Sequence, residues 1–272
     1  MKKVCFFCDW GENSSQLFDK YRTQTPSNSG VWGDIQGVRN KEEADYYVVM
    51  DGGFPQGVDR SKIIYLQREP PNIKNVKHNY PDILFQGTYD RFYQASVWWI
   101  KRNYDYLDKL EYSPKPKRVS CVMSGKVMCV GHKKRLQFAK QLSEHIDIDF
   151  WGRYLGGHIK RGYRGQLDDK YDGVANYDYS LVFENTNTDN YFTEKICDAF
   201  LTHTMPLYHG CVNIHEYFPK ESYYDIRGKT ITEIKDIINR APSKENIEAL
   251  KEAKDLVLNK YNLWATLERL LK

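Results

Sequence analysis

The sequence predicts an α/β protein with two parallel-sheet domains, and three observations support this fold class. The 272 residues lie in the size range where one hydrophobic core gives way to two. Strand-like and helix-like stretches alternate in two series, the order that builds parallel sheets. The segment 112–117, which carries two prolines, separates the series. We therefore expect one domain over residues 1–112 and another over residues 118–272.

The first series opens with an apolar strand at the N-terminus and continues with a short helix. Its later strands are rich in β-branched and aromatic residues, which favour strands. In chain order, the expected elements are a strand at 3–10, a helix that Ser14 or Ser15 caps and that runs through Tyr21, strands at 46–50, 63–66 and 83–85, and a helix-like aromatic stretch that holds Phe92, Trp98, Trp99 and Tyr104.

Pro114 and Pro116 interrupt the pattern, because proline lacks a backbone donor and disfavours helix in the residue before it. The alternation resumes after this linker. Ligands of parallel sheets bind beyond the carboxyl ends of the strands, so the loops there carry the candidate site. We expect strands at 118–123, 146–150, 179–183 and 205–209, helices at 132–145 and 192–203, and an amphipathic helical tail over 244–271.

The composition excludes several classes of protein. The net charge of +4 comes from 40 basic and 36 acidic residues spread along the chain, so no nucleic-acid footprint is expected. No apolar run reaches the length of about 18 residues that indicates a membrane span. The six cysteines are scattered, which favours a soluble protein of a reducing, cytoplasmic compartment. Cys5 and Cys8 point to opposite faces of their strand, so we interpret them as buried apolar thiols.

Residues 179–195 combine a strand, a polar loop and a helix start. Such a junction presents free backbone N–H groups and the positive helix end to an anion. Lys195 lies in the first helical turn, where the helix dipole disfavours a cation by ~0.3 to 1 kcal/mol, and a bound anion would reverse this penalty. Alternatively, Thr193 caps the helix, Glu194 complements the dipole, and Lys195 is solvated. These residues alone leave both interpretations open.

A longer pattern surrounds this junction. Phe183-Glu184-Asn185 is followed by Tyr191-Phe192-Thr193-Glu194-Lys195-Ile196, and then by Thr204-Met205-Pro206-Leu207-Tyr208-His209-Gly210. In order and spacing these residues resemble the signature of the inverting α1,3-fucosyltransferase family, with its FEN, its Y-x-TEK helix start and its T-x-P strand. The resemblance implies an α/β fold of the GT-B type, with two Rossmann-like domains facing across a cleft. The C-terminal domain would hold the nucleotide sugar and the N-terminal domain the acceptor.

The resemblance also implies a donor-binding set within the motif. Tyr191 would lie near the nucleotide, Glu194 would accept hydrogen bonds from ribose hydroxyls, and Lys195 would neutralise the diphosphate. Glu184 and Asn185 of the FEN would belong to the same site.

A further family feature is an arginine that opens the first helix of the C-terminal domain, after a strand that ends in serine. Ser124 and Arg135 fit this feature. A guanidinium can bind phosphate through two parallel hydrogen bonds, whereas Lys133 or Lys134 offers only a point charge. Which of the three basic side chains points inward stays open, and the alternative is a solvated basic helix start.

Glu69 is the candidate general base. It lies at the carboxyl end of a strand, where Pro70 and Pro71 stiffen the backbone. Its segment resembles the family segment whose glutamate is the proposed general base. The alternative is a surface glutamate paired with Arg68. In the catalytic interpretation Glu69 deprotonates the acceptor hydroxyl, which attacks the anomeric carbon with inversion. Cations such as Lys195 then stabilise the diphosphate as it leaves.

The expected partners are therefore a nucleotide sugar, with GDP-fucose first, and a glycan acceptor. Tyr177-Asp178-Tyr179 stands where the family has Y-K-F, so another donor such as UDP-xylose is an alternative. A catalytically inactive protein that binds sugar nucleotides or glycans is a second. Asp147-Ile148-Asp149 has the form of a D-x-D metal motif but lies in an alternating strand, so we expect solvent-facing aspartates, no metal site and no essential cofactor.

Overall fold

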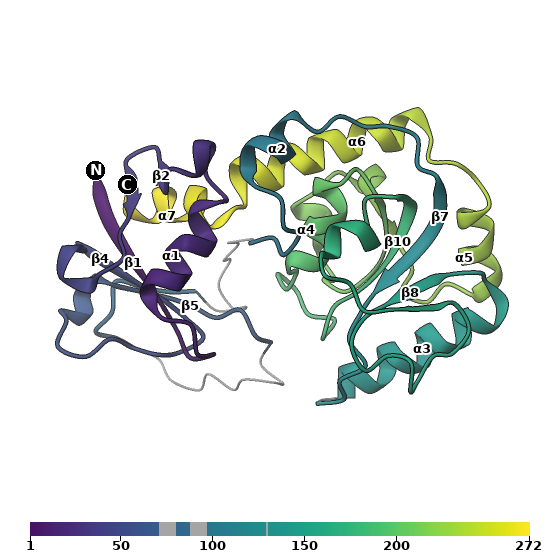
Figure 1. Ribbon diagram of the computed structural model, residues 1–272, viewed down its shortest axis with the longest axis horizontal. Helices are drawn as coiled ribbons and strands as arrows, with labels where there is room; N and C mark the ends of the chain where they lie inside the picture. The colour runs from purple at the N-terminus through teal and green to yellow at the C-terminus, as the bar shows by residue number, and fades with distance from the viewer. Residues whose placement is uncertain (71–79, 88–96, 129) are drawn as a thin grey trace. The chain divides into compact units, whose positions relative to one another are not determined.

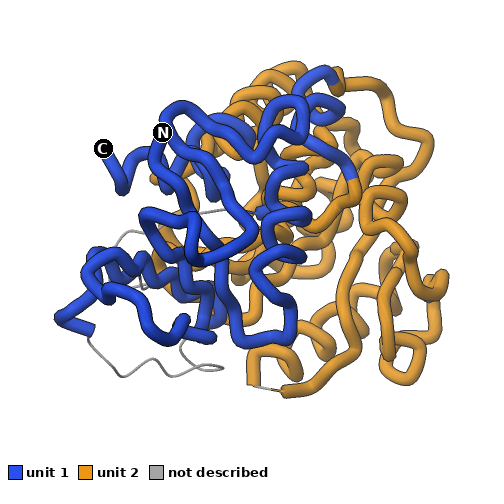
Figure 2. The backbone as a smooth tube through the Cα atoms, turned by 60° about the vertical axis from the view of Figure 1, so that its left-hand side comes forward, with its two compact units in different colours: residues 1–97, 102–109, 258–272 blue, residues 98–101, 110–257 orange. Residues whose placement is uncertain are grey.

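The computed structural model describes residues 1–70, 80–87, 97–128 and 130–272 (Figure 1). The chain divides into two compact units. The first holds residues 1–97, 102–109 and 258–272, and the second holds residues 98–101 and 110–257 (Figure 2). Within the described residues, each unit contains one six-stranded sheet.

The first sheet has the strand order β2-β3-β1-β4-β5-β6, and all its pairs are parallel except β2 with β3. β4 and β5 have the predicted bounds, because continuous runs of β-branched and aromatic residues define both. The strands are β1 (Lys2–Cys8), β2 (Val31–Trp32), β3 (Ile35–Gly37), β4 (Tyr46–Met50), β5 (Ile63–Leu66) and β6 (Phe85–Gly87).

Two helices from opposite ends of the chain cover one face of this sheet (Figure 1). They are α1 (Ser14–Arg22) and α7 (Leu263–Leu271). Trp264 of α7 is fully buried, packs edge-on against Phe6 of β1, and donates from Nε1 to the carbonyl of Tyr21 at 2.9 Å. The shorter helices of the unit are α2 (Tyr104–Lys109), η1 (Pro26–Asn28), η2 (Lys41–Glu43) and η3 (Arg60–Lys62).

The cap of α1 differs from the prediction. Asn13, rather than Ser14 or Ser15, is the N-cap. Its Oδ1 accepts from the backbone N–H of Gln16 at 3.0 Å, while the Gln16 side chain accepts from the backbone N–H of Asn13 at 2.9 Å. This reciprocal pair is a capping box, which satisfies two backbone donors at once.

The C-terminal tail is not one continuous helix. It consists of α6 (Lys244–Asp255), a π-helical turn η7 (Leu256–Lys260) and α7. Asn262 starts the last helix, because its Oδ1 accepts from the backbone N–H of Ala265 at 2.8 Å. Residues 258–272 belong to the first compact unit, whereas the predicted C-terminal domain, 118–272, included them.

The second sheet has the order β12-β11-β10-β7-β8-β9, and its strand pairs are parallel. Helices α3 (Val130–His145), α4 (Glu194–Leu201), α5 (Ile231–Ile238) and α6 belong to this unit. The strands are β7 (Lys117–Val122), β8 (Asp149–Trp151), β9 (Tyr163–Gly165), β10 (Tyr177–Phe183), β11 (Met205–His209) and β12 (Tyr224–Asp225). Single 3-10 turns are η4 (Lys170–Gly173), η5 (Ile214–Glu216) and η6 (Lys220–Ser222).

The predicted aromatic helix before the linker is partly wrong. Phe92 lies outside the described residues, and Trp98 and Trp99 are not helical. Their segment is held by Asp198, a fully buried residue of α4. One carboxylate oxygen of Asp198 accepts from the backbone N–H of Trp99 at 3.0 Å, and the other pairs with Lys170 Nζ at 2.6 Å. This tertiary contact overrides the local helical spacing.

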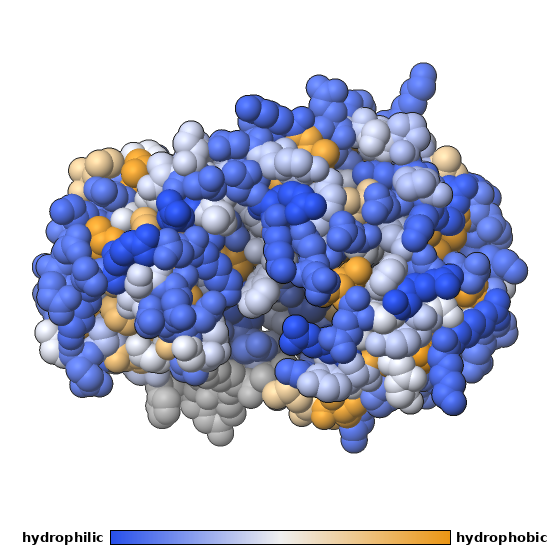
Figure 3. Space-filling model, viewed as in Figure 1, coloured by the Kyte–Doolittle hydropathy of each residue, from blue (hydrophilic) through white to orange (hydrophobic). Residues whose placement is uncertain are grey.

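The surface is consistent with the mild charge. On the face shown in Figure 3, hydrophilic residues predominate and apolar residues form small separate groups. Among the described residues, no helix has both the length and the apolar character that a membrane crossing requires.

We predict that Trp264→Ala destabilises the first unit by about 3 to 5 kcal/mol, because it leaves a large cavity and removes the hydrogen bond from Trp264 Nε1 to the carbonyl of Tyr21. Trp10→Ala is the matched control, since Trp10 is 38% exposed. Urea unfolding followed by circular dichroism measures both. Equal effects of the two substitutions would show that α7 is not part of the core.

We predict a pH-dependent stability from His203, which is 3% exposed and lies 3.0 Å through Nε2 from the carbonyl of Leu110. Burial lowers the pKa of His203 to about 4, and the charges of Lys254 and Lys115 act in the same direction. His203 therefore takes up a proton near pH 6.5 in the unfolded chain but only near pH 4 in the folded chain. Stability is fully present above pH 6.5 and falls by roughly 3 kcal/mol as the pH drops through this window. The variant His203→Gln cannot titrate, so its free energy of unfolding should fall less steeply with acid. An unchanged slope contradicts the assignment.

Candidate functional site

Five of the predicted site residues gather at one edge of the second sheet. β7 and β10 are neighbouring parallel strands, so their carboxyl ends meet at the same edge. Ser124 lies just beyond β7, and Glu184 and Asn185 directly follow β10. Arg135, in the second turn of α3, and Lys195, in the first turn of α4, contact these loop residues.

Arg135 is the basic residue of α3 that points inward. Its side chain is 8% exposed, whereas Lys133 and Lys134 are exposed. Nη1 donates to Asn185 Oδ1 at 2.9 Å, and Nη2 donates to the carbonyl of Ser124 at 3.2 Å. The guanidinium thus joins the loops that follow β7 and β10.

A buried carboxylate anchors the start of α4. Glu184 has no exposed side-chain surface, and its oxygens accept from Thr193 N at 2.9 Å and Thr193 Oγ1 at 2.8 Å. Burial raises the pKa of Glu184, while the ammonium of Lys195, 3.5 Å away, opposes this shift. Glu184, expected as a donor-binding residue, therefore lies beneath the helix start and holds its cap in place.

Lys195 is held rather than solvated. Thr193 does cap α4, but the Lys195 side chain is only 22% exposed, and Nζ lies 3.0 Å from Thr193 Oγ1 and 3.2 Å from Glu194 Oε1. Burial works to lower the pKa of Lys195, yet the carboxylates of Glu194 and Glu184 outweigh it, so the pKa is raised. The site thus keeps a fixed positive charge at the amino end of a helix, where an anion is favoured.

Tyr191 anchors the loop that leads into α4. Its ring is 1% exposed, so it lies in the core of the unit. The preceding residue, Asn190, has a left-handed φ of 61°. Asn213 holds it in place, accepting from Asn190 N at 2.8 Å and donating to Asn190 Oδ1 at 2.9 Å. These two hydrogen bonds fix the conformation of Asn190, directly before Tyr191.

His132 belongs to the same cluster, although its sequence context indicated only a basic helix start. The side chain is 6% exposed and lies one helical turn before Arg135. Its Nε2 is 3.1 Å from Asn185 Oδ1, and its Nδ1 is 3.2 Å from the backbone nitrogen of Met128. Burial lowers the pKa of His132, and the charges of Arg135 and Lys195 lower it further.

Glu69 lies in the first unit, three residues beyond β5, and is exposed. Asp51, at the end of β4, fixes its backbone: Oδ1 accepts from Arg68 N at 2.8 Å and from Glu69 N at 3.0 Å. Asp51 is 6% exposed and adopts a left-handed φ of 58°, which is uncommon outside glycine. This contact joins the residue after β4 to the segment after β5, so local sequence reasoning missed it.

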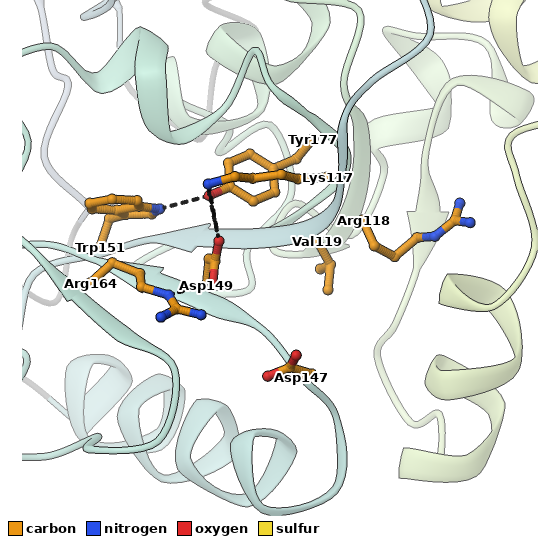
Figure 4. Close-up of a pocket in the computed structure, with 8 residues that line it drawn as sticks. All are labelled: Lys117, Arg118, Val119, Asp147, Asp149, Trp151, Arg164 and Tyr177. Atoms are coloured by element: carbon orange, nitrogen blue, oxygen red, sulfur yellow. Dashed lines mark hydrogen bonds and ion pairs between the residues drawn. The ribbon is translucent and has the colours of Figure 1, made fainter.

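A recess of about 450 Å³ occupies the opposite edge of the second sheet (Figure 4). Lys117 and Tyr177, the first residues of β7 and β10, line it together with Asp149, Trp151 and Arg164. Asp149 pairs with Arg164 at 2.7 Å and accepts from the Tyr177 hydroxyl at 2.8 Å. These contacts neutralise its charge, so we interpret the recess as a structural ion-pair network.

The D-x-D-like pair does not form a joint site. Asp147 is exposed as expected, while Asp149 is half-buried and committed to its partners. Among the described residues, no group of three or more histidine, cysteine, aspartate or glutamate side chains is placed to hold a metal ion. The cysteines are likewise unpaired by disulfides where described, with Cys5 buried and Cys8 half-buried.

Asp178, which suggested a different donor, lies at the amino end of β10 and pairs with Arg118 at 2.7 Å. Asn185 follows the other end of the same strand. The anionic residue therefore does not face the candidate site, and it gives no reason to prefer another donor.

The two parallel-rich α/β sheets resemble those of fucosyltransferase structures of the GT-B type. The chain belongs to glycosyltransferase family 10: the family model described as "Glycosyltransferase family 10 (fucosyltransferase) C-term" matches residues 112–247, half of the chain. A crystal structure of an α1,3-fucosyltransferase with GDP superposes with a TM-score of 0.54 and 17% identity, covering 99% of this chain and 88% of that one.

Curated relatives match over a shorter stretch. The GDP-fucose protein O-fucosyltransferase 3 of Danio rerio is 30% identical over 96 residues, 34% of this chain and 21% of that protein. The α-(1,3)-fucosyltransferase FucT of Helicobacter pylori is 30% identical over 92 residues, 34% of this chain and 19% of that protein. The matched segment thus spans about a fifth of each relative.

We predict that Glu184→Gln destabilises the second unit by roughly 1 to 3 kcal/mol, because the amide nitrogen faces a Thr193 donor in a buried site. Glu233→Gln is the matched control, since exposed Glu233 accepts from the backbone N–H and hydroxyl of Thr230 in the cap of α5. Denaturant titration should show a clearly smaller loss for the control. If the loss at position 184 is no larger than at 233, the clamp, by which we mean the buried contact of Glu184 with Thr193, adds no more stability than an exposed cap.

Proposed function

We propose that the chain is an inverting fucosyltransferase that transfers fucose from GDP-fucose to a hydroxyl of a glycan acceptor. The observation that carries the proposal is the charged Lys195 at the start of α4, with the guanidinium of Arg135 bound to the same loop system. Membership of family 10 supports it. The names of the relatives supply the donor and the sugar, since one is a GDP-fucose-dependent enzyme and the other an α-(1,3)-fucosyltransferase.

The second unit accounts for the leaving group. A nucleoside diphosphate departs with negative charge, so catalysis needs fixed positive charge rather than an acid at that oxygen. Lys195 and Arg135 supply it, and hydrogen bonds within the second unit restrain both side chains. Loss of one such preorganised donor costs about 2.7 to 4 kcal/mol in comparable sites.

The remaining donor contacts follow from position. Glu194 accepts hydrogen bonds from the ribose hydroxyls, and its side chain is 21% exposed. Ser124 and Asn185 border the phosphates together with Arg135. Tyr191 lies near the nucleotide as a support for the loop, since its ring is buried.

Glu69 is the proposed general base. Its side chain is exposed, as a group that meets an acceptor must be, while its backbone is fixed by Asp51. The carboxylate takes the proton from the acceptor hydroxyl as the oxygen attacks the anomeric carbon from the face opposite the diphosphate. A positioned base contributes roughly 10²- to 10⁴-fold in rate.

We predict that Glu69→Gln lowers the transfer rate by at least about 100-fold while the dissociation constant for GDP stays near wild type. Lys195→Ala should instead weaken GDP binding by at least about tenfold, because a charge-assisted contact is lost. Titration calorimetry with GDP and a transfer assay with GDP-fucose measure the two effects.

Lys140→Ala, an exposed lysine on α3, is the control for nonspecific charge effects. If Glu69→Gln weakens GDP binding as much as Lys195→Ala does, the division of roles is wrong. A thermal-shift panel of GDP- and UDP-sugars tests the donor, because the bound sugar nucleotide raises apparent stability. Stabilisation by UDP-xylose but not by GDP-fucose would refute the proposed donor.

A further inference from the structure

The hydrogen-bond directions around His132 follow from two groups that can only donate. The backbone N–H of Met128 donates to Nδ1, so Nδ1 carries no proton. A neutral imidazole must then hold its proton on Nε2, which donates to Asn185 Oδ1 at 3.1 Å. Burial and the charge of Arg135 keep the pKa of His132 lowered, which favours this neutral form.

The same reasoning orients the side-chain amide of Asn185. The guanidinium of Arg135 has no acceptor atom, so the group that faces it at 2.9 Å must be an oxygen. Two donors, from His132 and Arg135, therefore converge on Oδ1. The Nδ2 group is turned away from both, and it has no hydrogen-bond partner among the residues that the structure describes.

Asn185 is half-buried, and its loop directly adjoins the guanidinium of Arg135. An amide whose oxygen is satisfied twice cannot turn over without placing its NH₂ group against two donors. Such a reversal costs at least the two hydrogen bonds and adds a repulsive contact. The amide is thus locked with the two N–H donors of Nδ2 directed away from His132 and Arg135, and such donors suit an anionic or oxygen-rich ligand.

We propose that His132 is a positioning residue for the donor site: its Nε2–H holds the amide of Asn185 so that Nδ2 donates to an oxygen of the bound nucleotide. The inference rests on the proposed function, because it takes the nucleotide as the ligand. His132 itself does not touch the substrate. It links the loop after β7, through Met128, to the loop after β10.

Two substitutions separate the bonds of the imidazole. Glutamine places an amide nitrogen near the position of Nε2, so His132→Gln keeps the donor to Asn185 and loses the acceptor for Met128 N. Asparagine places an oxygen near the position of Nδ1, so His132→Asn keeps that acceptor and loses the donor. If the orientation of the Asn185 amide matters for nucleotide binding, the two variants must differ in their affinity for GDP.

The test is calorimetry with GDP, followed by kinetics with GDP-fucose. We expect His132→Asn to raise both the dissociation constant for GDP and the KM for GDP-fucose about five- to tenfold, with a smaller change in kcat. His132→Gln should restore both constants to within about twofold of wild type. A merely structural role predicts equal losses for both variants, and that result overturns the inference.

Asn185→Asp tests the outward donor independently of position 132. A carboxylate still accepts from His132 and Arg135, so the fold should be retained, but it presents an anion where Nδ2 stood. We expect GDP binding to weaken more than tenfold without loss of thermal stability. Tight GDP binding by this variant overturns the inference while wild-type binding upholds the proposed function. A wild-type chain that binds no GDP overturns the proposed function, and the inference with it.

Discussion

The second unit depends on one buried contact, the carboxylate of Glu184 on the backbone and hydroxyl of Thr193. A carboxylate with no exposed surface is costly unless its oxygens are bonded, and here each has a donor. The contact fixes the distance between the end of β10 and the start of α4. Because Lys195 lies two residues beyond Thr193, its position follows from the same clamp. The position of this charge thus depends on the buried contact between Glu184 and Thr193.

Parallel pairing explains why residues far apart in sequence meet at this clamp. β7 and β10 run side by side with Val119 opposite Tyr179, so the loops that follow them emerge together. Arg135 reaches both loops from the first part of α3. The opposite edge of the sheet holds the ion-pair network around Asp149 instead. The two edges therefore carry separate charge clusters, one around Arg135 and Lys195 and the other around Asp149.

Sequence reasoning predicted the parts that depend on local pattern. β4, β5 and β11 have their predicted bounds, because apolar runs bounded by turn residues define them. The motif between Phe183 and Gly210 indicated the family. The break in the tail was missed because the amphipathic period continues across it, and only the cap at Asn262 marks a new helix. Asp51 and His132 were missed because their contacts join segments that local pattern does not connect.

The packing of α7 on the first sheet affects the order in which this chain can fold during synthesis. Trp264 and its neighbours complete the core of the first unit, yet the ribosome makes them after the whole of residues 110–257. The second unit can therefore fold while the first unit still lacks helix α7. Until α7 is made, α1 alone covers this face of the first sheet, and such exposed apolar surface makes nascent chains prone to association.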